Sequence, residues 1–252
     1  MGAAALALEP LRRLGDTSLD GVFAGAEIGA CWAGSEPGLA AFGIPDGTGG
    51  VNPGDRRAIY HLVRAFGPRS VLEIGTHIGA STLHIAAALH GNHAQGGLPV
   101  RLTTVDVRDV NSRQDMPWKR HGASLSPQEM VERLGLAAIV EFVAGQSLDV
   151  MSSCETRFDL VFLDGDHSAE AVYREIPAAL RVLAPNGIIL LHDYFPGLRS
   201  LWSNGTVIRG PFEAVERLRG EGAGLAVLPL GALPWPTKLG SNVTSLALLL
   251  RA

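Results

Sequence analysis

The sequence has few cysteines and no long uninterrupted hydrophobic segment. Among its 252 residues are only two cysteines, Cys31 and Cys154, too few and too far apart for a zinc site or a disulfide framework, so both are expected to be free thiols. No apolar run reaches the ~20 residues that a membrane-spanning helix needs. The first residues also lack the basic region of a signal peptide. We therefore expect a cytoplasmic protein that does not bind membranes.

Clusters of one charge sign are also missing. The chain has 21 Lys and Arg against 25 Asp and Glu, a formal net charge of −4, and no run of like charge. Binding to a nucleic-acid backbone needs clustered Lys and Arg. No N-P-P-Y or D-P-P-Y motif, typical of enzymes that methylate a flipped base, occurs either. These absences disfavour a nucleic-acid partner and favour a small-molecule substrate.

Glycine, by contrast, is abundant near the start of the chain. Residues 1–52 are rich in Gly and Ala, and the motif GTGGVNPG covers the end of this stretch. We expect an irregular N-terminal extension or lid over residues 1–52, followed by one domain over residues 53–252. That domain opens with a helix from Asp55, which Gly67 should end. Its apolar residues have helical spacing, at Ile59, Leu62, Val63 and Phe66.

Short β-rich runs then alternate with helical segments, which is typical of a parallel sheet with helices on both faces. Ser126 and Glu129 form a capping box that starts one of the helices, ending near Leu134. Pro177 should kink or divide the helical segment over residues 168–183. The expected strands are residues 70–74, 101–106, 139–143, 158–164, 187–193, 225–230 and 243–250.

A glycine-containing turn follows the first expected strand. Glu73 is the last residue but one of the strand, and Gly75 and Gly79 lie in the turn before the helical segment ASTLHIAAAL. Glycines at such a turn let a ligand approach the backbone closely. The spacing G-x-x-x-G lacks the middle glycine of the dinucleotide motif G-x-G-x-x-G. A ligand without a pyrophosphate, such as S-adenosylmethionine, therefore suits this turn better than a dinucleotide does.

Polar residues also follow the second and third strands. Asp106 ends the second strand, where an acidic residue commonly accepts hydrogen bonds from ribose hydroxyls. Gly145, Gln146 and Ser147 follow the third strand and are small and polar, which suits the edge of an adenine ring. Two alternatives stay open. Asp106 would be an exposed acid at a strand end without a ligand, and the glycine-containing turn would only pack a helix on a strand.

Acidic and histidine residues end the fourth and fifth strands. If these strands are neighbours, Asp164 and Asp193 lie ~5 Å apart, a separation that one metal ion can bridge. Carboxylate oxygens favour Mg²⁺ or Ca²⁺, and participation of His192 would shift the preference towards Mn²⁺. His167 can reach a substrate hydroxyl, and its unperturbed pKa of ~6.5 allows it to accept a proton at neutral pH.

Three of these segments together resemble a known family. They are VLEIGTHIGASTLHIAAAL, the strand ending in Asp106, and FDLVFLDGDHSAEAVYREIPAALRVLAPNGIILLHDY. Over residues 55–195 the chain resembles the class I S-adenosylmethionine-dependent methyltransferases. It is most similar to small-molecule O-methyltransferases of the catechol, caffeoyl-CoA, macrocin and cephalosporin-tailoring types. The resemblance implies a doubly wound α/β fold, with a mostly parallel, seven-stranded, Rossmann-like sheet and helices on both faces.

The resemblance also implies a reaction and a set of site residues. The reaction is transfer of a methyl group from S-adenosylmethionine to a hydroxyl of a natural product, sugar or catechol-like molecule. A divalent metal would assist the reaction, and Mg²⁺ is the expected ion. In the catechol-type enzymes a lysine base often stands at the position of His167, and in the macrocin-like branch an acidic pair occupies the positions of His192 and Asp193. The expected catalytic residue is His167. The expected cofactor residues are Glu73, Gly75, Thr76, Gly79, Ser81, Asp106, Gly145, Gln146, Ser147 and Asp164. The expected metal ligands are Asp164, His192 and Asp193.

Three other functions stay open at this point. One is N-methylation of an amine or a protein, and another is an inactive, methyltransferase-like binding protein. The third is a nicotinamide-dependent oxidoreductase, which the G-x-x-x-G spacing disfavours. The sequence leaves open the acceptor, the metal and the formation of a homo-oligomer.

Overall fold

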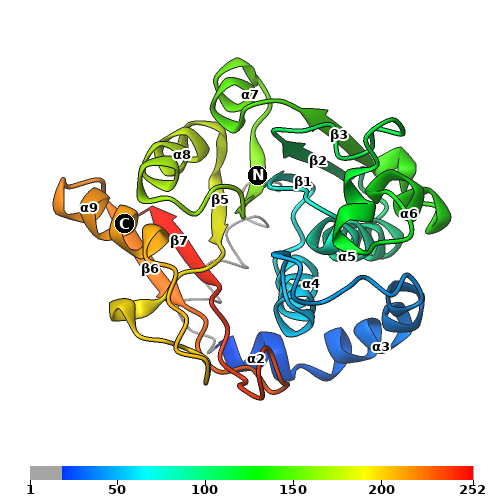
Figure 1. The fold of residues 1–252 in the computed structure, drawn as a ribbon, viewed down its shortest axis with the longest axis horizontal. Coiled ribbons are helices and arrows are strands. Elements are labelled where there is room, and N and C mark those ends of the chain that lie inside the picture. Colours follow the sequence, from blue (N-terminus) through cyan, green and yellow to red (C-terminus); the bar gives the residue numbers. More distant parts are fainter. Residues whose placement is uncertain (1–18, 252) are drawn as a thin grey trace.

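A single seven-stranded sheet forms the centre of the protein, in the strand order β3-β2-β1-β4-β5-β7-β6 (Figure 1). The structure is a computed structural model, and it describes residues 19–251. Strands β1 to β5 are parallel, and β7 runs antiparallel to both β5 and β6. The strands are β1 (Ser70–Ile74), β2 (Arg101–Asp106), β3 (Val140–Ala144), β4 (Phe158–Leu163), β5 (Leu183–Leu191), β6 (Leu225–Pro229) and β7 (Ala247–Arg251).

Helices cover both faces of this sheet, as the alternation in the sequence predicts. The α-helices are α2 (Leu19–Ala24), α3 (Ala26–Ala40), α4 (Pro53–Phe66), α5 (Ala80–Gly96), α6 (Pro127–Arg133), α7 (Ser147–Ser153), α8 (Ala169–Val182) and α9 (Gly210–Gly220). Successive strand residues point to opposite faces. In β4, Leu160 joins a core with helices α2 to α6, whereas Val161 joins a second core with α7 to α9. Both faces of the sheet are therefore covered by helices and shielded from water, which explains the continuous apolar runs of the central strands.

Most expected elements are confirmed within one to four residues. Strands β1 and β2 have the expected bounds, and Ser126 and Glu129 form the expected capping box at the start of α6. Of the two outcomes expected for Pro177, division of the helix is wrong, because α8 continues through it from Ala169 to Val182. Buried residues on both sides of Pro177, among them Ile176 and Ala178, hold this helix against the sheet. The free energy gained by packing these residues outweighs the loss of the backbone hydrogen bond that Pro177 cannot donate.

The expectation of an irregular N-terminal extension is wrong for residues 19–40, which form α2 and α3. Phe23, Trp32 and Leu39 of these helices are buried in the same core as α4. The ring of Phe23 packs edge-on against Trp235, with ring centroids 5.8 Å apart. This packing favours helices despite the helix-disfavouring glycines. Residues 1–18 of the expected extension lie outside the described residues.

No helix within residues 19–251 has the length and apolar composition needed to cross a membrane. Both cysteines are free, as expected from their number and spacing.

Candidate active site

A cavity of about 550 Å³ opens at the carboxyl ends of strands β1 to β4. Ligands of open parallel sheets bind at these ends of the strands. A hollow of about 720 Å³ lies at the opposite ends of the strands, beside Arg69 and Arg101, and contains none of the expected site residues. We therefore take the first cavity as the site. Among its lining residues are Gly49, Gly50, Gly75, His77, Asp106, Arg108, Gly145, Gln146, Ser147, Asp164, Asp166, His167 and Glu175.

The turn between β1 and α5 requires its two glycines. Gly75 has φ +99°, and a Cβ atom there would lie 2.0 Å from the backbone oxygen of Asp164. Gly79 has φ +78°, and a Cβ atom would lie 2.9 Å from Pro127. The two glycines thus allow segments of the chain itself to pack closely. Close approach of a ligand to this turn stays a prediction, and Gly75 also lines the cavity.

Glu73 lies behind this turn, where its carboxylate is fully buried. It accepts hydrogen bonds from the hydroxyls of Ser81 at 2.5 Å, Thr82 at 2.6 Å and Thr104 at 2.6 Å. Burial outweighs these donors and raises the pKa of Glu73 to about 7. Thr76 pairs its hydroxyl with that of Thr104 at 2.6 Å. The network ties the turn to β2 and α5.

Four of the expected cofactor residues therefore lie outside the cavity lining. They are Glu73, Thr76, Gly79 and Ser81. Their direct contact with a cofactor stays a prediction, and the structure gives them a role in shaping the turn.

Asp106 lies in the cavity wall at the end of β2. Its Oδ2 accepts the backbone N–H of His77 at 2.9 Å, and its Oδ1 accepts that of Arg108 at 3.0 Å. Each carboxylate oxygen can accept a further hydrogen bond. The backbone thus fixes the orientation of Asp106 while leaving it able to accept hydroxyl donors.

The residues that follow β3 also line the cavity, as expected for Gly145, Gln146 and Ser147. The Ser147 hydroxyl donates to Glu175 Oε1 at 2.5 Å. Burial raises the pKa of Glu175 above its usual value. Glu175 lies on α8, and no motif in the sequence indicated its position in this wall.

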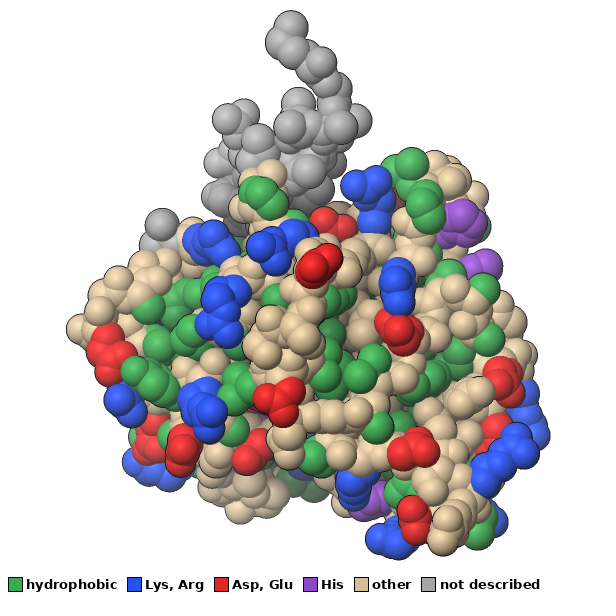
Figure 2. Space-filling model, turned by 90° about the horizontal axis from the view of Figure 1, so that it is seen from above, with side chains coloured by type: hydrophobic (Ala, Val, Ile, Leu, Met, Phe, Trp, Pro, Cys, Tyr) green, Lys and Arg blue, Asp and Glu red, His purple; other side chains and the backbone are tan. Residues whose placement is uncertain are grey.

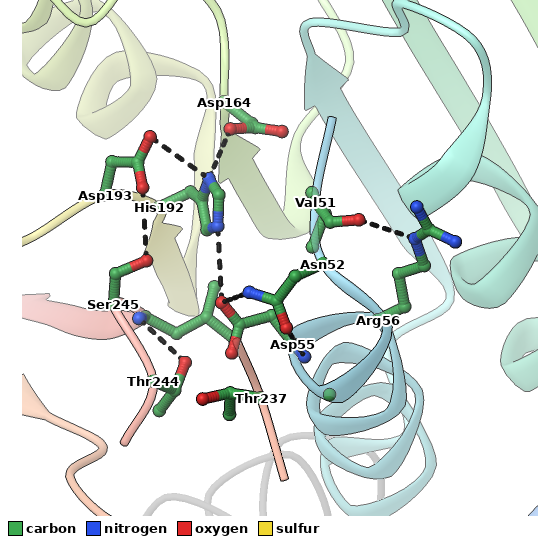
Figure 3. Close-up of polar contacts among 12 residues, drawn as sticks. Val51, Asn52, Asp55, Arg56, Asp164, His192, Asp193, Thr237, Thr244 and Ser245 are labelled. Atoms are coloured by element: carbon green, nitrogen blue, oxygen red, sulfur yellow. Dashed lines mark hydrogen bonds and ion pairs between the residues drawn. The ribbon is translucent and has the colours of Figure 1, made fainter. Parts of the chain in front are cut away.

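Asp164, His192 and Asp193 lie close together at the ends of β4 and β5 (Figure 3). His167 joins them in a compact cluster, and Asp164 and His167 also line the cavity. Strands β4 and β5 are neighbours, as the expected metal site requires, with Leu163 opposite Leu191. His192 Nδ1 lies 2.7 Å from Asp164 Oδ1 and 3.8 Å from Asp193 Oδ2. His167 Nε2 lies 3.7 Å from Asp164 Oδ1 and 3.5 Å from Asp193 Oδ2.

The charges of this cluster control the protonation of His192. Burial by itself would lower the pKa of His192, but the carboxylates of Asp193 and Asp164 raise it well above its usual value. Without a metal, the imidazolium of His192 therefore balances negative charge at the strand ends, and a metal bound through Nδ1 would replace the proton on that nitrogen.

The cluster contains three groups that could hold a metal ion. Asp164, His167 and His192 each offer one ligand atom, and the three atoms lie within 4.8 Å of one another. This set contains His167 in place of Asp193, which remains a predicted ligand. One carboxylate and two imidazoles favour Mn²⁺ or a similar ion over Mg²⁺, which prefers oxygen ligands.

The matching segment of a known family coincides with this site. A family model described as a methyltransferase domain matches residues 72–194. The match extends from β1 past the end of β5 and includes Asp106 and the cluster around Asp164. Over residues 72–194 the chain therefore resembles a methyltransferase domain.

Individual relatives of the methyltransferase domain are distant. The chain is 26% identical over 172 residues to a catechol O-methyltransferase from Niastella koreensis. The aligned region covers 67% of each of the two chains. It is 24% identical over 127 residues to the O-methyltransferase hkm8 from Aspergillus hancockii, covering 50% of this chain and 43% of hkm8. The chain thus spans about half to two thirds of the length of these curated relatives.

Solved structures share the fold over most of the chain. The cofactor-bound protein Rv0187 from MTB has a TM-score of 0.57 and 23% identity, covering 94% of this chain and 95% of Rv0187. The O-methyltransferase TomG from Streptomyces achromogenes, solved in complex with SAM, has a TM-score of 0.55 and 19% identity, covering 88% and 89% of the two chains. At these identities the likeness concerns the fold of the methyltransferase domain.

Proposed function

We propose that this protein transfers the methyl group of S-adenosylmethionine to a hydroxyl of a small molecule. One observation carries the proposal: Asp164 and His167 line the cavity and also belong to the candidate metal cluster. A cofactor in the cavity would therefore lie next to groups that can hold and deprotonate an acceptor. The names of the relatives and the SAM complex of TomG support the same reaction.

The cavity has the size and polarity for the cofactor. Ligand pockets commonly measure ~300 to 1,000 Å³, and this one measures about 550 Å³. We assign the ribose hydroxyls to Asp106, the adenine edge to Gly145, Gln146 and Ser147, and the methionine end to the turn at Gly75. This assignment follows the order of the strand ends along the sheet.

Methyl transfer is a displacement in line with the carbon–sulfur bond. The acceptor oxygen forms a bond to the methyl carbon while the carbon–sulfur bond breaks. The electron pair of the broken carbon–sulfur bond stays on sulfur. The enzyme must align these three atoms and exclude competing water. His167 lies at the cavity wall with a half-buried side chain, where it can contact the acceptor hydroxyl.

Asp164, His167 and His192 are the residues that would hold a metal. When bound, a divalent ion lowers the pKa of the acceptor hydroxyl. A nitrogen that ligates a metal cannot also accept the hydroxyl proton. Metal-dependent activity would assign His167 as a ligand, and metal-independent activity would assign it as the general base that the sequence predicts.

Methyl transfer from radiolabelled S-adenosylmethionine to catechols, glycosides and amines tests the proposal. The assay compares Mn²⁺, Mg²⁺ and a chelator in parallel. We expect labelled O-methyl product from a hydroxyl acceptor, with Mn²⁺ supporting at least as much activity as Mg²⁺. Label found only in amine products would replace O-methylation by N-methylation.

A further inference from the structure

Asp55 is a buried carboxylate that the sequence indicates only as part of a helix start. It lies in the first turn of α4 and is fully buried. Its backbone N–H donates to Asn52 Oδ1 at 3.0 Å, so Asn52 caps the helix. The Asp55 carboxylate is not needed for that cap. Burying a carboxylate is costly unless charged or polar partners compensate, so its position needs another explanation.

The partners of this carboxylate connect α4 to the cluster at the strand ends (Figure 3). Asp55 Oδ2 accepts a hydrogen bond from Asn52 Nδ2 at 2.7 Å and lies 3.4 Å from His192 Nε2. Asp55 Oδ1 and His192 Nε2 have no hydrogen-bond partner among residues 19–251. Both groups are thus buried, of opposite charge when ionised, and within ion-pair distance.

The two ring nitrogens of His192 therefore face different carboxylates. Nδ1 forms a hydrogen bond with Asp164 Oδ1 at 2.7 Å, and the same oxygen lies 3.7 Å from His167 Nε2. Nε2 points towards Asp55 on the other side of the ring. A histidine that ligates a metal through one nitrogen commonly donates its other N–H to a carboxylate, which fixes the tautomer. In this structure the carboxylate of Asp55 faces Nε2 of His192 at 3.4 Å, within ion-pair distance.

We propose that Asp55 is a positioning residue that keeps a proton on Nε2 of His192 and so directs the lone pair of Nδ1 into the site between Asp164 and His167. The inference rests on the metal site of the proposed function. It identifies Nδ1 as the ligand atom and makes α4, at the start of the domain, a support of that site.

A merely structural acid at a helix N-terminus would behave differently. Its loss would lower stability through the helix dipole but would leave the metal affinity and the histidine tautomer unchanged. Glu170 is a suitable control, because it is an exposed acid in the first turn of α8. Glu170→Gln removes a helix-terminal charge without touching His192.

The test measures Mn²⁺ binding by calorimetry for the wild type, Asp55→Ala, Asp55→Asn and Glu170→Gln. Loss of such an outer carboxylate typically weakens metal binding ~10- to 100-fold, and we expect this for Asp55→Ala. Asp55→Asn, which keeps an acceptor oxygen, should lose less than Asp55→Ala, and Glu170→Gln should match the wild type. A folded Asp55→Ala protein with wild-type affinity would overturn the inference.

Nitrogen-15 spectra of histidine-labelled, Zn²⁺-loaded wild-type protein test the tautomer without any change at Asp55. The His192 signals are assigned by their absence in His192→Gln. We expect a metal-shifted Nδ1 and a proton bonded to Nε2, and the reverse pattern would overturn the inference. Titration with S-adenosylmethionine in the presence of a chelator separates this inference from the proposed function. If the wild type binds the cofactor but no metal, the metal site and the role of Asp55 both fall, whereas the cofactor site stands.

Discussion

Glu73 illustrates how one buried carboxylate affects the pH dependence of stability. Its pKa is raised from 4.5 to about 7, mainly by burial. Between these values the folded state keeps a proton that the unfolded state releases. The stabilising contribution is therefore complete below pH 4.5 and is lost as the pH rises to about 7. A shift of this size corresponds to about 3 kcal/mol at ~1.4 kcal/mol per unit.

Glu73→Gln should remove this dependence, because glutamine stays neutral at every pH. Relative to the wild type, we expect the variant's free energy of unfolding to increase by about 2 to 3 kcal/mol between pH 5 and pH 8. Urea unfolding of both proteins at several pH values measures the difference. Parallel curves would show that Glu73 is ionised in the folded protein throughout this range.

Asp193 contributes to the charge of the cluster rather than to the cofactor wall. It has φ +54°, which asparagine tolerates, and its Oδ1 accepts a hydrogen bond from the Ser245 hydroxyl at 3.2 Å. Asp193→Asn should lower methyl transfer at least about tenfold, since it removes a charge worth ~1.5 to 3 kcal/mol to its partners. Affinity for S-adenosylmethionine should be unchanged in calorimetry. Retained activity would remove Asp193 from the mechanism.

At the scale of elements, the turn between β1 and α5 depends on Gly75. Its positive φ and the 2.0 Å contact leave no room for a side chain. Gly75→Ala should destabilise the protein by at least about 2 kcal/mol and should weaken cofactor binding. Gly96→Ala is the matched control, since no atom lies within 4 Å of the added carbon, and should change stability by less than about 1 kcal/mol. Equal effects of the two changes in denaturant unfolding would contradict this role.

The elements that the sequence predicts well are those with a strong local signal. Strands β1 and β2 and the capping box of α6 follow directly from apolar runs and from residue spacing. Helices α2 and α3 escaped prediction because their glycines mask a propensity that only packing on α4 reveals. The contacts of Asp55 and Glu175 join elements far apart in the sequence. No local pattern encodes such contacts.

At the scale of the molecule, the site draws on most of the chain. The sheet order brings together Asp55 of α4, Asp164 after β4, His192 after β5 and Ser245 before β7. On the face seen in Figure 2, acidic and basic side chains are interspersed with apolar ones, without a continuous basic surface.

The packing of α2 and α3 on α4 predicts that residues 19–40 unfold together with the domain rather than as a detachable lid. Phe23 is buried and contacts Trp235, which lies between β6 and β7. Phe23→Ala should lower the free energy of global unfolding by about 3 kcal/mol, in one cooperative transition followed by circular dichroism. Unchanged global stability would show that the segment docks and releases independently.

Calorimetric titration of the metal-free protein with S-adenosylmethionine, S-adenosylhomocysteine and NADH tests the central claim most directly. We expect micromolar binding of the first two and none of NADH. Asp106→Ala should bind S-adenosylmethionine about 10- to 100-fold more weakly, because it loses charge-assisted hydrogen bonds to the ribose. The exposed Asp109→Ala, in the same loop, should match the wild type. No binding of either sulfur compound, with or without Mn²⁺, would contradict the account.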